Sequence, residues 1–220
     1  MLFRSVLAAE RTVSWLIGAA TRDPGSLGRL SPWLVVLVVH WRLVRARPDD
    51  AEAPLYLLFG SAVGLILAAT GVSRMLGSSL DRLYDRRWTT VVVDTGADPL
   101  RGSLVLAGIG VLVWWWYWFR HAVRYGRSPG RDAFVLLGGV LGGLVAAVVS
   151  GAQVFYAVLV WFAGDPGPER AAAHFSSVPG AASIAVTGTV VWWYHRGVRS
   201  EEHTSELQSH HDLVCRLLLE

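Results

Sequence analysis

The chain has 220 residues, of which 53% are hydrophobic and 17% are charged, and it includes 11 tryptophans. This composition is typical of membrane proteins and excludes an ordinary water-soluble domain. The formal net charge is +3 and every basic residue is Arg, which excludes a phosphate-binding loop of the Gly-x-x-x-x-Gly-Lys type. No nucleic-acid partner is indicated, because basic linkers that face anionic lipid head groups account for the positive charge.

The N-terminal segment, residues 1–25, is predicted to be an amphipathic helix or the truncated remnant of an earlier span. Leu2 and Val13 lie on the apolar side of such a helix, while Arg4 and Arg11 lie elsewhere. A signal peptide is disfavoured, because the apolar stretch is short and follows an internal charged pair.

Five stretches are candidate membrane spans, since about 20 apolar residues cross a hydrocarbon core of about 30 Å. A short one covers residues 30–41 and can extend if its flanking Arg side chains reach the interface. The other four carry no charge and cover residues 54–73, 102–119, 133–164 and 178–194.

The stretch 133–164 is longer than one perpendicular span requires. One helix is favoured, because two helices would need a hairpin inside hydrocarbon. This helix either tilts strongly, or leaves the membrane near Gly151 or beyond and ends at Gly164. Its two overlapping small-residue motifs, Gly138-x-x-x-Gly142 and Gly139-x-x-x-Gly143, predict close contact with a neighbouring helix.

The spans recur along the chain as a predicted tandem repeat of two-helix units. A shift of 79 positions aligns Leu57-Leu58-x-Gly60 with Leu136-Leu137-x-Gly139, and a shift of 75 sets Trp118 on Trp193. The predicted fold is therefore all-α, a polytopic transmembrane helical bundle of tandem two-helix repeats. Its units are a first repeat with an outer loop (26–101), a second repeat (102–177) and the first helix of a truncated third repeat (178–198).

Residues 199–220 differ in amino-acid composition from the rest of the chain. Read as codons, Arg199 to His210 and Leu213 to Glu220 match a widely used short-read sequencing adapter in frame, so we predict that this tail is not native. The alternative is a charged amphipathic tail. The tail holds the only cysteine, Cys215, so the remaining chain excludes disulfides, thiol catalysis and Cys-based metal sites. The Arg-only, Gly- and Ala-rich remainder indicates a GC-rich, bacterial source.

Three helix ends carry an aromatic residue, a His and an Arg, each followed by an Arg-bearing linker. They are His40-Trp41-Arg42, Phe119-Arg120-His121 and Tyr194-His195-Arg196. With these motifs, residues 30 to 198 resemble the bacterial membrane family called domain of unknown function 5671. The resemblance implies a polytopic, multi-pass plasma-membrane protein and implies no activity.

The placement of Arg residues predicts the orientation of the chain. The linker from Arg120 to Asp132 is rich in Arg and is placed inside. By alternation, residues 78–101 and 165–177 are placed outside, although the first of these loops also carries several Arg residues.

The recurring His40, His121 and His195 could be haem or metal ligands or a proton relay, but a place in the interfacial belt is favoured. Arg74 and Gln153 are equivalent in the repeat and could mark a substrate path, but they are expected to reach the outer interface. The aromatic run Trp114–Phe119 could stack against a lipid or cofactor, and an interfacial girdle is favoured.

No catalytic, cofactor-binding or metal residue is therefore assigned, and no enzyme or cofactor is predicted. A structural or interaction subunit of the membrane is favoured. Its partners would be the lipid bilayer and other subunits, in homo- or hetero-oligomers formed through Gly-rich helix faces. The alternatives are a transporter or channel component and a haem or metal carrier that uses the recurring His residues.

Overall fold

The computed structural model describes residues 12–13, 42, 55–88, 99–124, 128–164 and 170–217, and the side chains of its last helix only as far as Ser200. The described part is helical and contains no strand. Its elements are α3 (Leu55–Trp88), α4 (Pro99–Trp114), the π-helix η1 (Trp115–Phe119), the 3₁₀ turn η2 (Ala122–Arg124), α5 (Pro129–Ala133), the π-helix η3 (Phe134–Leu141), α6 (Gly142–Ala163), α7 (Ala171–His174) and α8 (Val178–Leu217). The predictions for residues 1–25 and 30–41, His40 included, lie outside the described residues except at positions 12 and 13.

Four helical segments in the described part are long and apolar enough to cross a membrane. They cover Leu55–Trp88, Pro99–Phe119, Pro129–Ala163 and Ala171–Ser200. The predicted all-α membrane fold is confirmed, and each of the four uncharged windows lies within or largely within one of these helices. The long window forms one continuous helical rod that is capped at Gly164, as predicted, and does not form a hairpin.

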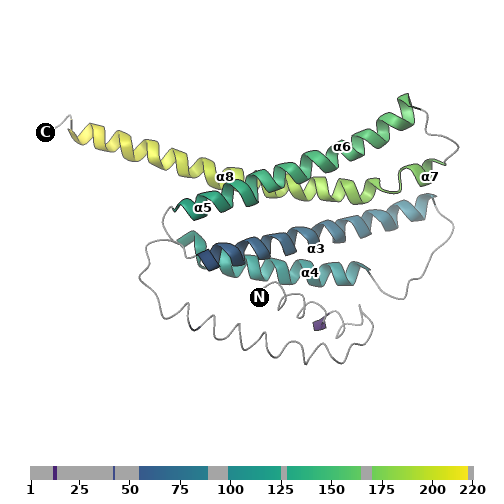
Figure 1. The fold of residues 1–220 in the computed structure, drawn as a ribbon, viewed down its shortest axis with the longest axis horizontal. Coiled ribbons are helices and arrows are strands. Elements are labelled where there is room, and N and C mark those ends of the chain that lie inside the picture. The colour runs from purple at the N-terminus through teal and green to yellow at the C-terminus, as the bar shows by residue number, and fades with distance from the viewer. Residues whose placement is uncertain are drawn as a thin grey trace.

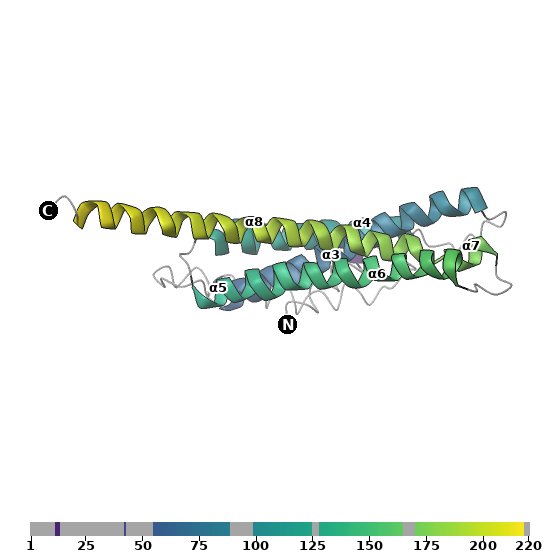
Figure 2. The ribbon, with the colours of Figure 1, turned by 90° about the horizontal axis from the view of Figure 1, so that it is seen from above.

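The four segments form two antiparallel hairpins (Figure 1). The first joins α3 to α4, and the second joins the rod of α5, η3 and α6 to α8. The connections within both hairpins lie at one end of the bundle, which we call the loop end. The linker after η1 and the start of α5 lie at the other end, the linker end. Seen from above, the bundle is flat and elongated, and α8 extends past the other helices at its C-terminal side (Figure 2).

Much of the predicted outer loop, residues 78–101, is helical, and its placement outside the membrane stays a prediction. Helix α3 continues to Trp88 and α4 already begins at Pro99. The charged residues of this stretch misled the prediction, since Tyr84 and Trp88 continue one side of the helix and their rings lie 6.4 Å apart. The Tyr84 hydroxyl also donates a hydrogen bond of 2.9 Å to the carbonyl oxygen of Ala172, which ties the end of α3 to α7.

Glycines bring the two helices of each hairpin into backbone contact. A Cβ at Gly143 would lie 2.6 Å from the backbone nitrogen of Trp192, and one at Gly188 would lie 2.8 Å from that of Ala147. The first hairpin has the same kind of contact, where Gly64 lies against the backbone of Trp114 and Gly110 against that of Ala68. Small residues allow such close approach between membrane helices, where dispersion contacts replace the hydrophobic effect as the main attraction.

Three close contacts made by glycines in the first hairpin have counterparts in the second hairpin. The pairs Gly60–Tyr117, Gly64–Trp114 and Gly110–Ala68 correspond to Gly139–His195, Gly143–Trp192 and Gly188–Ala147. The α3 residues shift by the predicted 79 positions, whereas the α4 residues shift by 78 and not by the expected 75. The two interfaces therefore correspond residue by residue, and a tandem repeat of the whole unit stays a prediction.

Candidate functional site

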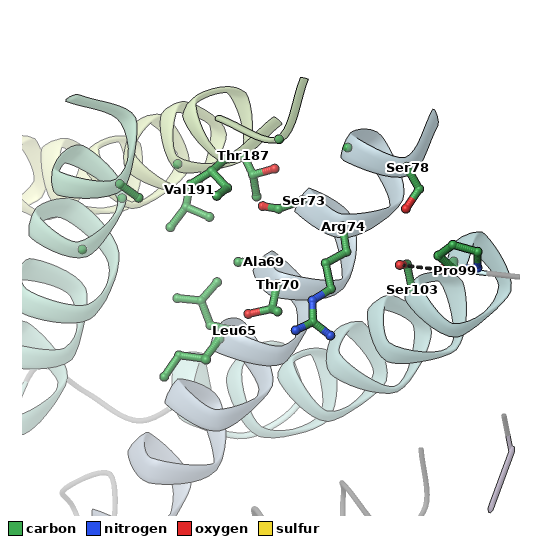
Figure 3. A pocket seen from close by; sticks show the side chains of 18 of the residues that line it. Leu65, Ala69, Thr70, Ser73, Arg74, Ser78, Pro99, Ser103, Thr187 and Val191 are labelled. Atoms are coloured by element: carbon green, nitrogen blue, oxygen red, sulfur yellow. Dashed lines mark hydrogen bonds between the residues drawn. The ribbon is translucent and has the colours of Figure 1, made fainter. Parts of the chain in front are cut away.

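A groove of about 860 Å³ lies between the two hairpins (Figure 3). One wall is α3 with the first turns of α4, and the opposite wall is formed by η3, α6 and α8. The opposite wall presents few large side chains to the groove, because it consists largely of small residues, among them Gly138, Gly142 and Gly188. A volume of this size lies within the range of about 300–1,000 Å³ found for small-molecule sites.

Polar side chains of α3 line the groove at intervals of one to four residues, which keeps them on one side of the helix. We call this set the polar stripe; it consists of Thr70, Ser73, Arg74, Ser78 and Asp81. None of its three hydroxyl groups makes a hydrogen bond within the described part of the chain. Two hydroxyls elsewhere on the groove wall are engaged, since Ser103 and Thr187 donate to backbone carbonyls at 2.7 and 2.9 Å.

Arg74 gives the groove its positive charge. Figure 3 shows the guanidinium group directed back along α3 toward the level of Thr70 and lying between α3 and α4. Side chains on a helix lean toward its N-terminus, and the small Gly102 and Ser103 of α4 leave space there. The structure contains no membrane, so the expectation that Arg74 reaches the outer interface stays a prediction. Gln153, its predicted counterpart, is exposed on α6 away from the groove.

An aromatic cluster fills the linker end of the bundle, where the two π-helices meet. Trp118 of η1 and His195 of α8 are both fully buried. The Trp118 ring lies 5.0 Å from that of Phe134 in η3, and its Nε1–H donates a hydrogen bond of 3.0 Å to the Tyr194 hydroxyl. π-Helical turns within α-helices occur often at functional sites, and here they place large rings against one buried imidazole.

The three recurring histidines do not share one environment. His195 is buried, because its ring packs against Gly139 inside the second hairpin, and its level relative to the membrane interface stays a prediction. Its Nδ1 lies 2.9 Å from the carbonyl oxygen of Val191, and its buried Nε2 has no partner among the described residues. His121 instead stacks beside Trp116, with ring centroids 5.3 Å apart.

The residues of the aromatic run Trp114–Phe119 differ in how far they are exposed. Trp118 is fully buried, whereas Trp115, Trp116 and Phe119 are exposed over 39–49% of their surface. The exposed rings fit the expected girdle at a helix end, and the buried ring belongs to the core. No group of three or more His, Cys, Asp or Glu side chains that could hold a metal ion occurs in the part of the chain that the structure describes.

Comparison with curated proteins and with solved structures found no match to this chain. A family model does match, over residues 52–190, which includes α3 through α6, the first part of α8 and all residues that line the groove except Val191. The family is described only as a domain of unknown function. On the extent of this match, the chain belongs to the membrane family DUF5671.

Proposed function

We propose that this chain is a non-catalytic structural or interaction subunit of the plasma membrane, and that it assembles with further copies of itself. One observation supports the proposal. The face of α3 that α8 covers corresponds, at the offset of 79 positions, to an exposed face of η3 and α6 in the second hairpin. The absence of an assigned catalytic group in the sequence fits this class, but the argument rests on the helix face.

In the first hairpin, α3 is covered on two sides. One side packs on α4 through glycines, and the other packs on α8. On the α8 side, Leu58 and Leu65 share a core cluster with Val191, and a Cβ at Gly77 would lie 3.7 Å from the Ser183 hydroxyl oxygen. In the second hairpin, α6 packs mainly on α8 within the described residues, and no second long helix covers its other side as α8 covers α3.

The offset of 79 positions identifies the corresponding face of α6 and η3. Leu58, Leu65 and Gly77 become Leu137, Leu144 and Tyr156, and these three are exposed over 59%, 40% and 69% of their surface. We call them the open face. A helix equivalent to α8, supplied by a second copy, would cover the open face in the way that α8 covers α3.

This proposal changes which surface mediates assembly. The Gly-rich faces were the expected oligomer contacts, but Gly139 and Gly143 already contact α8 within the chain, and Gly138 and Gly142 line the groove. The open face presents large apolar side chains, and it resembles the α3 surface before α8 packs on it. Assembly would therefore rely on side-chain packing of Leu and Tyr residues.

Site-specific photo-crosslinking in lipid vesicles tests this idea. A photoreactive phenylalanine derivative at Leu144 should give a covalent dimer or larger species of the purified protein. The same group at Leu112, which is 66% exposed on α4, is the matched control and should label lipid only. Equal crosslinking at the two positions, or a monomer in both, would contradict the proposal.

A transporter or channel component is the second candidate, and it is favoured by the Arg74 groove together with the two π-helical segments. Charged residues and interrupted helices in membrane spans often mark substrate paths. Ion or solute flux into vesicles that contain the protein, lost in Arg74→Gln and kept in Arg86→Gln, would favour this candidate over a subunit without transport activity.

A haem or metal carrier is a weaker alternative, because His121 and His195 have separate aromatic neighbours. It predicts visible absorbance or bound metal in the purified protein that falls in His195→Ala. Unchanged absorbance and metal content in His195→Ala and His121→Ala would exclude it.

A further inference from the structure

We propose that the groove between the hairpins binds a phospholipid with an amine-bearing head group, its phosphate at Arg74 and its ammonium at Asp81. The proposal concerns a site within one chain and does not depend on assembly through the open face. It rests on three features of the groove: its length, its unpaired cation and the spacing of its two charges.

Between Arg74 and the linker end, the groove has about the length of one lipid leaflet, and its lining there is apolar or small except for the hydroxyls of Thr70 and Ser73. From Arg74 the lining continues toward the linker end as far as Leu65 on α3, with Ile184 and Val191 opposite on α8. Nine residues at a rise of about 1.5 Å make about 13 Å. Half of a hydrocarbon core of about 30 Å is about 15 Å, so a lipid acyl chain matches this depth.

Arg74 is placed at the head-group end of that apolar part. No carboxylate in the described part of the chain pairs with it, and the hydroxyls of Thr70 and Ser73 beside it are also available as donors. A guanidinium group presents several N–H donors in a planar fork that matches phosphate oxygens. Bare lipid tails cannot satisfy such a cation, which makes an anionic group its natural partner.

Asp81 determines which phosphate-bearing lipid fits. It lines the same groove seven residues after Arg74, so the two Cα atoms lie about 10 Å apart along the helix. The Arg74 guanidinium, which is directed toward Thr70 in Figure 3, would turn toward Asp81 to share one head group. Two hydrogen bonds of about 3 Å each, joined through the O–P–O–C–C–N atoms of phosphoethanolamine with bonds of about 1.5 Å, can span a distance of this order. A head group with both charges therefore satisfies both side chains.

The same carboxylate disfavours the other occupants of an Arg site. A purely anionic head group such as phosphoglycerol, or free phosphate, would leave Asp81 beside a like charge. A choline head group has no N–H to donate to the carboxylate. A single acidic side chain next to the phosphate position thus gives selectivity by rejecting alternatives as well as by binding the amine.

Native mass spectrometry of the full chain in detergent tests the proposal with three lipids of identical acyl chains. Phosphatidylethanolamine should bind about tenfold more tightly than phosphatidylglycerol or phosphatidylcholine, the size of one charge-assisted hydrogen bond. Arg74→Gln should weaken all three by about tenfold, whereas Arg74→Lys should keep much of the binding. Asp81→Asn should weaken phosphatidylethanolamine binding by about tenfold, to the level of the other two lipids, and so remove the preference.

The matched control is Arg86→Gln, because Arg86 lies on the same helix outside the groove. Equal binding in Arg74→Gln and Arg86→Gln would overturn the phosphate assignment, and a preference that survives in Asp81→Asn would overturn the ammonium assignment. Soluble glycerophosphoethanolamine should fail to displace the lipid at equal concentration. If it competes equally well, the groove binds a head group alone and the acyl-chain assignment is wrong.

Discussion

Replacing Gly143 by Ala tests whether backbone contact between α6 and α8 holds the second hairpin together. The new Cβ would lie 2.6 Å from the backbone nitrogen of Trp192 and 2.8 Å from the carbonyl oxygen of Gly188. Real Cβ contacts of this kind are not found below 3.0 Å. Both obstacles are backbone atoms that cannot rotate away, so the two helices must separate by several tenths of an ångström.

The expected cost follows from a comparison with a second glycine of the same helix. Overpacking of a well-packed interface costs about 1–3 kcal/mol. Ala also favours a helix over Gly by about 1 kcal/mol, but this gain applies equally to Gly151→Ala, whose added Cβ meets nothing within 4 Å. The difference in the free energy of unfolding between the two variants should therefore be about 1–3 kcal/mol, with Gly143→Ala the less stable.

The free energy of unfolding can be measured for both variants by titrating SDS into mixed micelles and following the loss of helical circular dichroism. Gly151→Ala should be as stable as the original chain or slightly more stable. If Gly143→Ala has the stability of Gly151→Ala, the helices are not in backbone contact, and the correspondence between the two hairpins loses its physical basis.

Three further predictions follow from single contacts and from the tail. Tyr84→Phe removes the hydrogen bond to α7 and should lower the free energy of unfolding by about 1 kcal/mol; the same change at exposed Tyr156 is the control, and equal effects would contradict the role of the contact. Trp118→Phe replaces a buried ring by a smaller one and removes its hydrogen bond to Tyr194, so the free energy of unfolding should fall by about 1–3 kcal/mol. Thermal unfolding in detergent should then have a lower midpoint temperature, and an unchanged midpoint would refute this. Sequencing of the source locus by a method without the adapter should show the reading frame continuing past Val198 with a different, Gly-rich sequence, and an encoded Arg199–Glu220 would restore Cys215 to the native chain.

The four membrane helices were predictable because a hydrocarbon solvent imposes one strong requirement. Every backbone polar group must be satisfied within the helix, so an uncharged apolar run of sufficient length has few other structures available. The end of α3 was not predictable in the same way. Outside the apolar core, charged residues are compatible with a loop or a helix, and the choice depends on contacts such as that of Tyr84 with α7.

The two small-residue motifs of the long rod show where pattern reasoning stops. Both motifs predicted close helix contact, and Gly139 and Gly143 make it with α8. Gly138 and Gly142 have the same spacing one residue earlier, yet they line the groove. Spacing identifies a small face on a helix, but the direction of that face relative to its neighbours also depends on the π-helical turn at Phe134–Leu141, which changes the rotation of the rod.

The same limit explains why the groove beside Arg74 was not predicted. The spacing of Thr70, Ser73, Arg74, Ser78 and Asp81 already defines one polar side of a helix in the sequence. A polar side at the end of a span has two interpretations, contact with head-group water or contact with a protein cavity. Only the position of the second hairpin distinguishes them, because its glycine wall encloses the stripe without filling the space beside it. A polar stripe that faces a glycine-lined wall is therefore the combination that indicates a ligand site in a chain of this kind.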